Sequence, residues 1–92
     1  YLISDMGEWR FFITPEAEKN FEQLDAVVKK QIASKLDWFV NNFENVTPLP
    51  LSGLRKGFFK LRAGDWRIIY EIDNVEKLIV VHLIKNRNKI YK

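Results

Sequence analysis

The sequence contains no cysteine among its 92 residues, which excludes a disulfide framework and a thiolate metal site. No apolar run reaches the length of about 18 residues that a membrane-spanning helix needs, and no signal peptide is visible. The chain also lacks a Gly-rich phosphate loop, a cluster of metal-ligand residues and an ordered Ser/His/Asp set. We therefore expect a cytoplasmic protein that uses neither a cofactor nor a metal.

Acidic residues are scarce in the second half of the chain. Residues 48–92 hold four Asp/Glu against ten Lys/Arg, a balance of +6, whereas residues 1–47 hold eight against five, a balance of −3. A basic half is typical of nucleic-acid binders, and equally of proteins that dock onto an acidic partner. The length suits one domain over residues 1–92. Met6 is a candidate first residue of the natural protein, and we expect residues 1–7 to be a native extension or residues added for recombinant expression.

The first part of the chain predicts one strand followed by two helices. Residues 8–13 (EWRFFI) read as a strand with Trp9, Phe11 and Ile13 on one face. Thr14 followed by Pro15 is typical of a helix N-terminus, and Asp25 is a candidate cap for a second helix. Apolar side chains recur at helical spacing at Ala17, Phe21, Leu24, Val28, Ile32, Leu36, Phe39 and Phe43. Both helices should therefore bury one face against a sheet.

The second part predicts three strands. Residues 45–53 contain two prolines and should form a loop. Residues 57–72 (GFFKLRAGDWRIIYEI) read as a β-hairpin around a Gly-Asp turn. Residues 77–84 (KLIVVHLI) are apolar on both faces, which is typical of a strand inside the sheet. The predicted order is β-α-α-β-β-β, an α+β domain with a two-helix hairpin on one face of a small, mostly antiparallel sheet.

The hairpin determines which side chains share a face. Counting outward from the turn at Gly64 and Asp65 places Arg62 directly opposite Arg67. The core face then collects Phe59, Leu61, Ala63, Trp66, Ile68 and Tyr70, and the other face collects Phe58, Lys60, Arg62, Arg67, Ile69 and Glu71. Opposed like charges cost stability, so we expect an anion such as phosphate between them. The alternative is a solvated face whose cations keep the protein soluble.

The single histidine, His82, lies within the strand that we expect inside the sheet. A histidine in such a strand is more often a structural residue with satisfied hydrogen bonds than a catalyst, and we assign it that role. The tail from residue 85 to 92 is basic and carries Tyr91 near its end.

Four stretches of the sequence, taken together, are specific enough to indicate a protein family. They are residues 9–17 (WRFFITPEA), 51–57 (LSGLRKG), 60–70 (KLRAGDWRIIY) and 87–91 (RNKIY). Through them the chain resembles the RelE/ParE superfamily of small bacterial toxins from type II toxin–antitoxin modules, over nearly its whole length from Glu8. The resemblance implies the same β-α-α-β-β-β order and a cognate antitoxin as partner.

The RelE branch of that superfamily cuts mRNA in the ribosomal decoding site, so the resemblance implies an mRNA interferase. The residues that match its catalytic positions are Lys60, Arg67, Arg87 and Tyr91, and further candidates for RNA contact are Arg62, Lys56, Lys85 and Lys89. The sequence departs from the branch at Phe58, where well-studied members are basic, and at Asn86, where many have His. Members of the ParE branch poison DNA gyrase without nuclease activity and share the strand motif and the Arg…Tyr tail. A gyrase inhibitor, or an inactive relative that binds antitoxin, is therefore the alternative.

RNA cleavage by a 2′-hydroxyl that attacks its own 3′ phosphate needs a proton acceptor and stabilisation of the growing phosphorane charge. Arg62, Arg67 and Arg87 are suited to the charge. Lys60 is the first candidate for the proton acceptor. Glu71, on the same face, is the second, although it more readily partners a cation.

Overall fold

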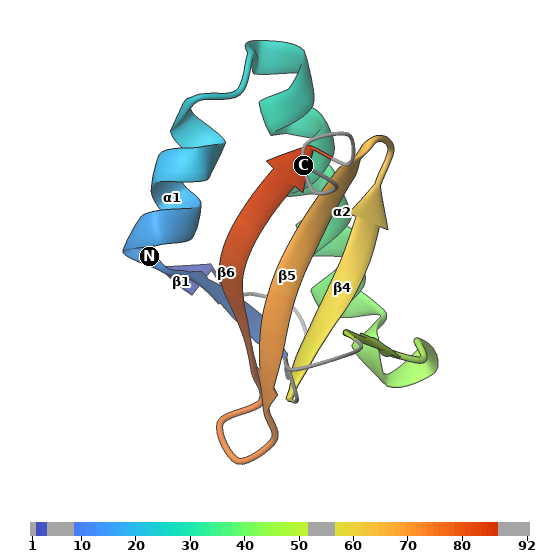
Figure 1. Ribbon diagram of the computed structural model, residues 1–92. Helices are drawn as coiled ribbons and strands as arrows, with labels where there is room; N and C mark the ends of the chain where they lie inside the picture. Colours follow the sequence, from blue (N-terminus) through green and yellow to red (C-terminus); the bar gives the residue numbers. More distant parts are fainter. Residues whose placement is uncertain (1, 4–8, 52–56, 87–92) are drawn as a thin grey trace.

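A computed structural model describes residues 2–3, 9–51 and 57–86, and these form one sheet with two helices (Figure 1). The elements are β1 (Leu2–Ile3), β2 (Arg10–Ile13), α1 (Pro15–Glu22), α2 (Ala26–Asn41), a 3-10 turn (Phe43–Asn45), β3 (Leu49–Pro50), β4 (Phe58–Ala63), β5 (Trp66–Asp73) and β6 (Leu78–Asn86). The α+β class and the β-α-α-β-β-β order are confirmed, with β1 and β3 as two additional short strands.

The sheet in the described residues has the order β1-β2-β6-β5-β4-β3. All neighbouring strands pair antiparallel except β2 and β6, which are parallel. The strand predicted at residues 77–84 corresponds to β6 and lies inside the sheet, as expected. The prediction of a loop at residues 45–53 was wrong for Leu49–Pro50, which pair with β4. A proline is tolerated there because an edge strand need not donate every backbone N–H to a neighbour.

Both helices begin where the sequence predicts, because side-chain oxygens satisfy their free N–H groups. Thr14 Oγ1 accepts from the Ala17 N–H at 3.2 Å, and Pro15 occupies the first turn of α1. Asp25 Oδ1 accepts from the Val28 N–H at 2.9 Å at the start of α2. These local caps separate the two helices and let them fold back against the sheet.

The core lies between the helices and one face of the sheet. Its buried members are Trp9, Phe11, Ile13, Ala17, Ile32, Leu36, Phe39, Val40, Ala63, Ile68, Tyr70, Ile79, Val81 and Ile84. Phe39 of α2 stands edge-on to Tyr70 of β5 and to Phe43, with ring centroids 5.1 and 5.3 Å apart. Figure 1 shows α2 behind β4, β5 and β6, so neither helix of the described residues covers the opposite side of these strands. We call that side the open face.

The predicted hairpin register is confirmed residue by residue. Gly64 has φ +65°, a left-handed conformation that glycine adopts without strain, and Ala63 pairs with Trp66 across the turn. Arg62 pairs with Arg67. On the other side of β5 the pairing with β6 is interrupted by a β-bulge between Ile69 and Tyr70.

We predict that the buried Tyr70 lowers the free energy of unfolding at alkaline pH. It is 1% exposed, and burial raises its pKa from 10.0 to about 12. Because the folded state holds the phenol proton more tightly than the unfolded chain, this contribution is complete below pH 10 and is lost as pH rises from 10 to 12. We expect Tyr70→Phe to reduce the alkaline loss of unfolding free energy by about 2 kcal/mol. Urea unfolding at pH 9 and pH 11.5 tests this, and equal losses in both proteins would contradict it.

Candidate functional site

Three cations form a row across the open face. Arg62 on β4 pairs with Arg67 on β5, and Arg67 in turn pairs with Lys85 on β6. Adjacent strands are about 4.8 Å apart, and directly paired residues project to the same side of the sheet. We call Arg62, Arg67 and Lys85 the cation row. The row concentrates positive charge at the end of the sheet that is next to the turn between β4 and β5.

Lys60 adds a fourth cation one row further along the strands. It pairs with Ile69, which pairs with Leu83, so the row next to the cations is largely apolar. A cavity of about 410 Å³ is lined by Leu49, Lys60, Leu61, Arg62 and Arg67. Such a volume falls in the range of small-ligand pockets, about 300–1,000 Å³. The cavity therefore offers space beside three of the four cations.

The next row holds a hydrogen-bonded acid–imidazole pair. The Nε2 atom of His82 lies 2.9 Å from Oε1 of Glu71, and their side chains are 32% and 50% exposed. Glu71 pairs with Phe58 across the strands, and the Phe58 and His82 rings have centroids 5.1 Å apart. His82 does have a hydrogen-bond partner, as we expected of a structural residue. It faces the open side of the sheet, however, and is not part of the core.

A β-bulge lies at His82. Counted from the turn between Asp73 and Leu78, an uninterrupted register would pair His82 with Ile69, which faces the open side. In the structure Tyr70 pairs with Val81 and Ile69 with Leu83, so His82 is the additional residue of the bulge. No residue of the KLIVVHLI stretch is a glycine or proline that would signal a bulge.

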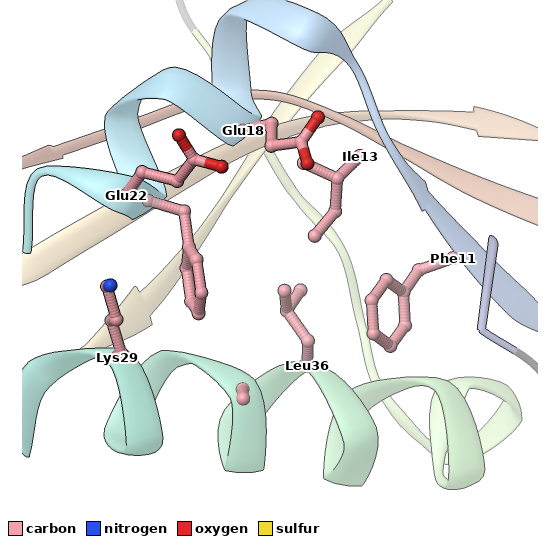
Figure 2. A pocket seen from close by; sticks show the side chains of 8 residues that line it. Phe11, Ile13, Glu18, Glu22, Lys29 and Leu36 are labelled. Atoms are coloured by element: carbon pink, nitrogen blue, oxygen red, sulfur yellow. The ribbon is translucent and has the colours of Figure 1, made fainter. Parts of the chain in front are cut away.

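A second cavity, of about 240 Å³, lies on the helical side of the molecule. Its lining residues are Phe11, Ile13, Glu18, Phe21, Glu22, Lys29, Ala33 and Leu36. Figure 2 shows it between the two helices, with Glu22 and Lys29 toward one end and Phe11 toward the other. The lining is mainly apolar and adds nothing to the cation row.

Within residues 2–3, 9–51 and 57–86, no group of three His, Cys, Asp or Glu side chains gathers that could hold a metal ion. Neither helix in this part of the chain is long and apolar enough to cross a membrane. The ionisable groups that the described residues place on the open face of β4, β5 and β6 are therefore four cations, the Glu71 and Asp73 carboxylates and one imidazole.

A family model for the ParE toxin of type II toxin–antitoxin systems matches residues 11–91. The chain belongs to this ParE toxin family. The matched range covers the sheet from β2 onward, both helices and the segment that contains Arg87 and Tyr91. The resemblance expected from the sequence is thus confirmed, and the chain is a toxin of the type II toxin–antitoxin class. A search of curated proteins finds no match.

Solved structures with the same fold include RelE toxins. The RelBE2 toxin–antitoxin complex of Mycobacterium tuberculosis aligns with a TM-score of 0.78 at 20% identity, over 88% of this chain and 100% of that one. The isolated RelE toxin of E. coli aligns with a TM-score of 0.69 at 19% identity, over 92% of both chains. The archaeal RelE–RelB complex of Pyrococcus horikoshii gives 0.67 at 21% identity, over 90% and 99%. These likenesses establish the common fold.

In this ParE-family chain, four of the site residues predicted from sequence come together on the open face. They are Lys60, Arg62, Arg67 and Lys85. The other four, Lys56, Arg87, Lys89 and Tyr91, lie outside the described residues. Lys85 was expected as an RNA contact in the basic tail, and its place in the cation row follows from the β5–β6 pairing.

Proposed function

We propose that this ParE-family toxin is a ribosome-dependent mRNA endonuclease. The observation that carries the proposal is the cation row of Arg62, Arg67 and Lys85, with Lys60 in the adjacent row. Opposed like charges on neighbouring strands lower stability by about 0.2–1 kcal/mol per pair. A polyanion lying across the three strands offsets that cost. RNA phosphates suit the row because arginine donates two parallel hydrogen bonds to a phosphate.

The proposed reaction uses the RNA's own 2′-hydroxyl as nucleophile and needs no metal. Arg67 and Lys60 stabilise the charge that grows on the phosphorane oxygens, and Arg62 and Lys85 hold the neighbouring backbone. Arg87 and Tyr91 complete the proposed catalytic set, the arginine at the phosphate and the tyrosine stacked on a base. Lys56 and Lys89 add further RNA contacts. The ribosome positions the mRNA and excludes water, which allows a small enzyme to act with few groups of its own.

The proposed protein partner is a cognate antitoxin. The fold neighbours from M. tuberculosis and P. horikoshii are toxins crystallised with their antitoxins. An antitoxin with acidic side chains complements the basic half of this chain, which carries a balance of +6 over residues 48–92. A ribosomal target places the proposed activity in the cytoplasm.

A second candidate is a gyrase-inhibiting toxin without nuclease activity. It is favoured by the family match, because the matching model is that of the ParE toxin. In that case the cation row is a docking surface for DNA gyrase and takes part in no reaction. The two candidates predict different products in the cell, and one experiment separates them.

That experiment maps transcript ends by primer extension after the toxin is induced in cells that lack its antitoxin. We expect new ends within translated codons, which disappear when translation is blocked. A variant with Arg67→Ala and Arg87→Ala should produce none of them, whereas Lys30→Ala, an exposed lysine of α2, should produce the wild-type pattern. Intact transcripts with halted growth and inhibited supercoiling would instead support the gyrase candidate. Intact transcripts with normal growth would indicate an inactive relative.

A further inference from the structure

We propose that His82 accepts the proton of the attacking 2′-hydroxyl and that Glu71 is the positioning residue that orients its imidazole. This assignment rests on the proposed endonuclease function. Its basis is the hydrogen bond of 2.9 Å between His82 Nε2 and Glu71 Oε1 on the same face as the cation row. The assignment identifies a proton acceptor, which the four cations do not provide.

The backbone geometry presents His82 to the open face. The β5–β6 ladder is regular from the Asp73–Leu78 pair to the Tyr70–Val81 pair. His82 follows the core-facing Val81, so strand alternation turns it to the side of Glu71. The bulge then places both His82 and Leu83 opposite Ile69, on the side that carries Lys60 and Arg67.

The hydrogen bond determines which imidazole nitrogen is the base. A carboxylate oxygen only accepts, so the proton of the neutral ring lies on Nε2, which donates to Glu71 Oε1. The lone pair is then on Nδ1. The Phe58 ring, tilted by 56° with its centroid 5.1 Å away, limits rotation of the imidazole. A histidine oriented by a carboxylate is the arrangement of a general base in hydrolytic and transfer enzymes.

The other ionisable groups on the described open face are less suited to this role. Arginine and protonated lysine are donors without an acceptor, so the four cations can stabilise negative charge but cannot take a proton in that form. The Oε1 atom of Glu71 is already engaged by His82, and Oδ1 of Asp73 accepts from the Val75 and Glu76 N–H groups at the turn. The neutral imidazole of His82, by contrast, carries a lone pair on one ring nitrogen that can accept a proton.

For one nucleotide to reach both the base and the cations, the long Lys60 and Arg67 side chains must extend along the open face toward His82. Strands β4 and β6 lie about 10 Å apart across β5, and successive rows on one face are about 7 Å apart. Lys60 is in the row between the cation row and the Glu71–His82 pair. An RNA strand over this face therefore brings its scissile phosphate toward Lys60 and the adjoining 2′-hydroxyl toward His82.

The step balances without any added reagent. The 2′-hydroxyl proton moves to Nδ1 of His82 as the O2′–P bond forms, and the phosphorane charge is stabilised by Lys60 and Arg67. The P–O5′ bond then breaks, and the leaving 5′ oxygen takes a proton from water. The products are a 2′,3′-cyclic phosphate and a 5′-hydroxyl end. The imidazolium returns its proton to water and is ready for another cycle.

The test measures cleavage of a ribosome-bound model mRNA by purified toxin variants. We expect His82→Ala to lower the cleavage rate by about 100-fold or more, the usual contribution of a general base. Added imidazole should restore part of that rate, which a purely structural role for His82 would not allow. The control is Val80→Ala, a partly buried β6 residue that pairs with Glu71 and carries no ionisable group. If His82→Ala does not fold in urea-unfolding assays, His82→Gln replaces it.

Glu71 has its own test. Glu71→Gln retains an amide oxygen that can accept from Nε2, so it should keep more activity than Glu71→Ala. In the His82→Ala background, Glu71→Ala should cause no further loss, because its effect acts through His82. Independent, additive losses would overturn the positioning role.

The outcomes separate this inference from the function on which it rests. The role of His82 is supported if the wild type cleaves the mRNA, a folded His82 variant does not, and imidazole restores part of the rate. Wild-type cleavage with His82→Ala within threefold, or a folded variant that imidazole does not rescue, overturns the role of His82 alone and leaves the endonuclease intact. An absence of cleavage by the wild type on ribosomes overturns both.

Discussion

Replacing Arg62 and Arg67 together by alanine is expected to lower mRNA cleavage by about three orders of magnitude, since removal of one preorganised donor to a transition-state oxyanion typically costs 10²- to 10³-fold. The two guanidinium groups are paired across β4 and β5, and so they can act on one phosphate or on neighbouring ones. The measurement is the single-turnover cleavage rate on ribosome-bound mRNA.

The control for this prediction is a double variant with the same change of charge. Lys19→Ala with Lys30→Ala removes two exposed cations from the helices and should leave cleavage within about threefold of wild type. An equal loss in both double variants would mean that net charge, and not the cation row, governs activity.

Removing only one of the two opposed arginines is expected to have the opposite effect on stability. Because opposed cations repel, Arg62→Ala should leave the free energy of unfolding unchanged or raise it by a few tenths of a kcal/mol. A site that costs stability while it supports activity is typical of functional surfaces. A loss of more than about 1 kcal/mol in Arg62→Ala would show that the side chain has a structural role.

Phe39→Ala is expected to have the largest effect on the fold, about 3–5 kcal/mol. Phe39 is 1% exposed and contacts Phe43 and Tyr70 edge-on, so truncation leaves a cavity where α2 meets the sheet. A domain of this size has a total stability of only about 5–15 kcal/mol. We expect the urea midpoint to fall by about 2 M.

Trp38 provides the matched control for that experiment. It precedes Phe39 on α2, but its side chain is 49% exposed, and its contact is with Lys35, whose Nζ lies 4.7 Å from the ring centroid. Trp38→Ala should therefore cost about 1 kcal/mol or less. If both substitutions lowered the free energy of unfolding by a similar amount, the core would not lie between α2 and β5.

Local chemistry made much of the fold predictable. The positive φ at Gly64 is required by a two-residue turn, and the alternation of strands then determines the face of every hairpin side chain. The caps at Thr14 and Asp25 work through atoms three residues away. Each of these features depends on neighbours in sequence, so it can be derived from the sequence alone.

Pairing between distant strands was not predictable in the same way. The short edge strand at Leu49–Pro50 forms because β4 offers a free edge, not because proline favours a strand. Lys85 joins the cation row because β6 lies next to β5 in a particular register. Neither partner can be identified from the stretch in which the residue occurs.

The sequence by itself determined the α+β class, the helix ends, the hairpin register and the pairing of Arg62 with Arg67, since these follow from short-range geometry. Only the tertiary structure decided that Lys85 extends the cation row and that His82 faces Glu71. For Lys85 the physical reason is the bulge in the β5–β6 ladder, which shifts the side-chain alternation by one residue and carries no signature in the β6 sequence. For His82 it is the side-chain contact with Glu71 across β5 and β6.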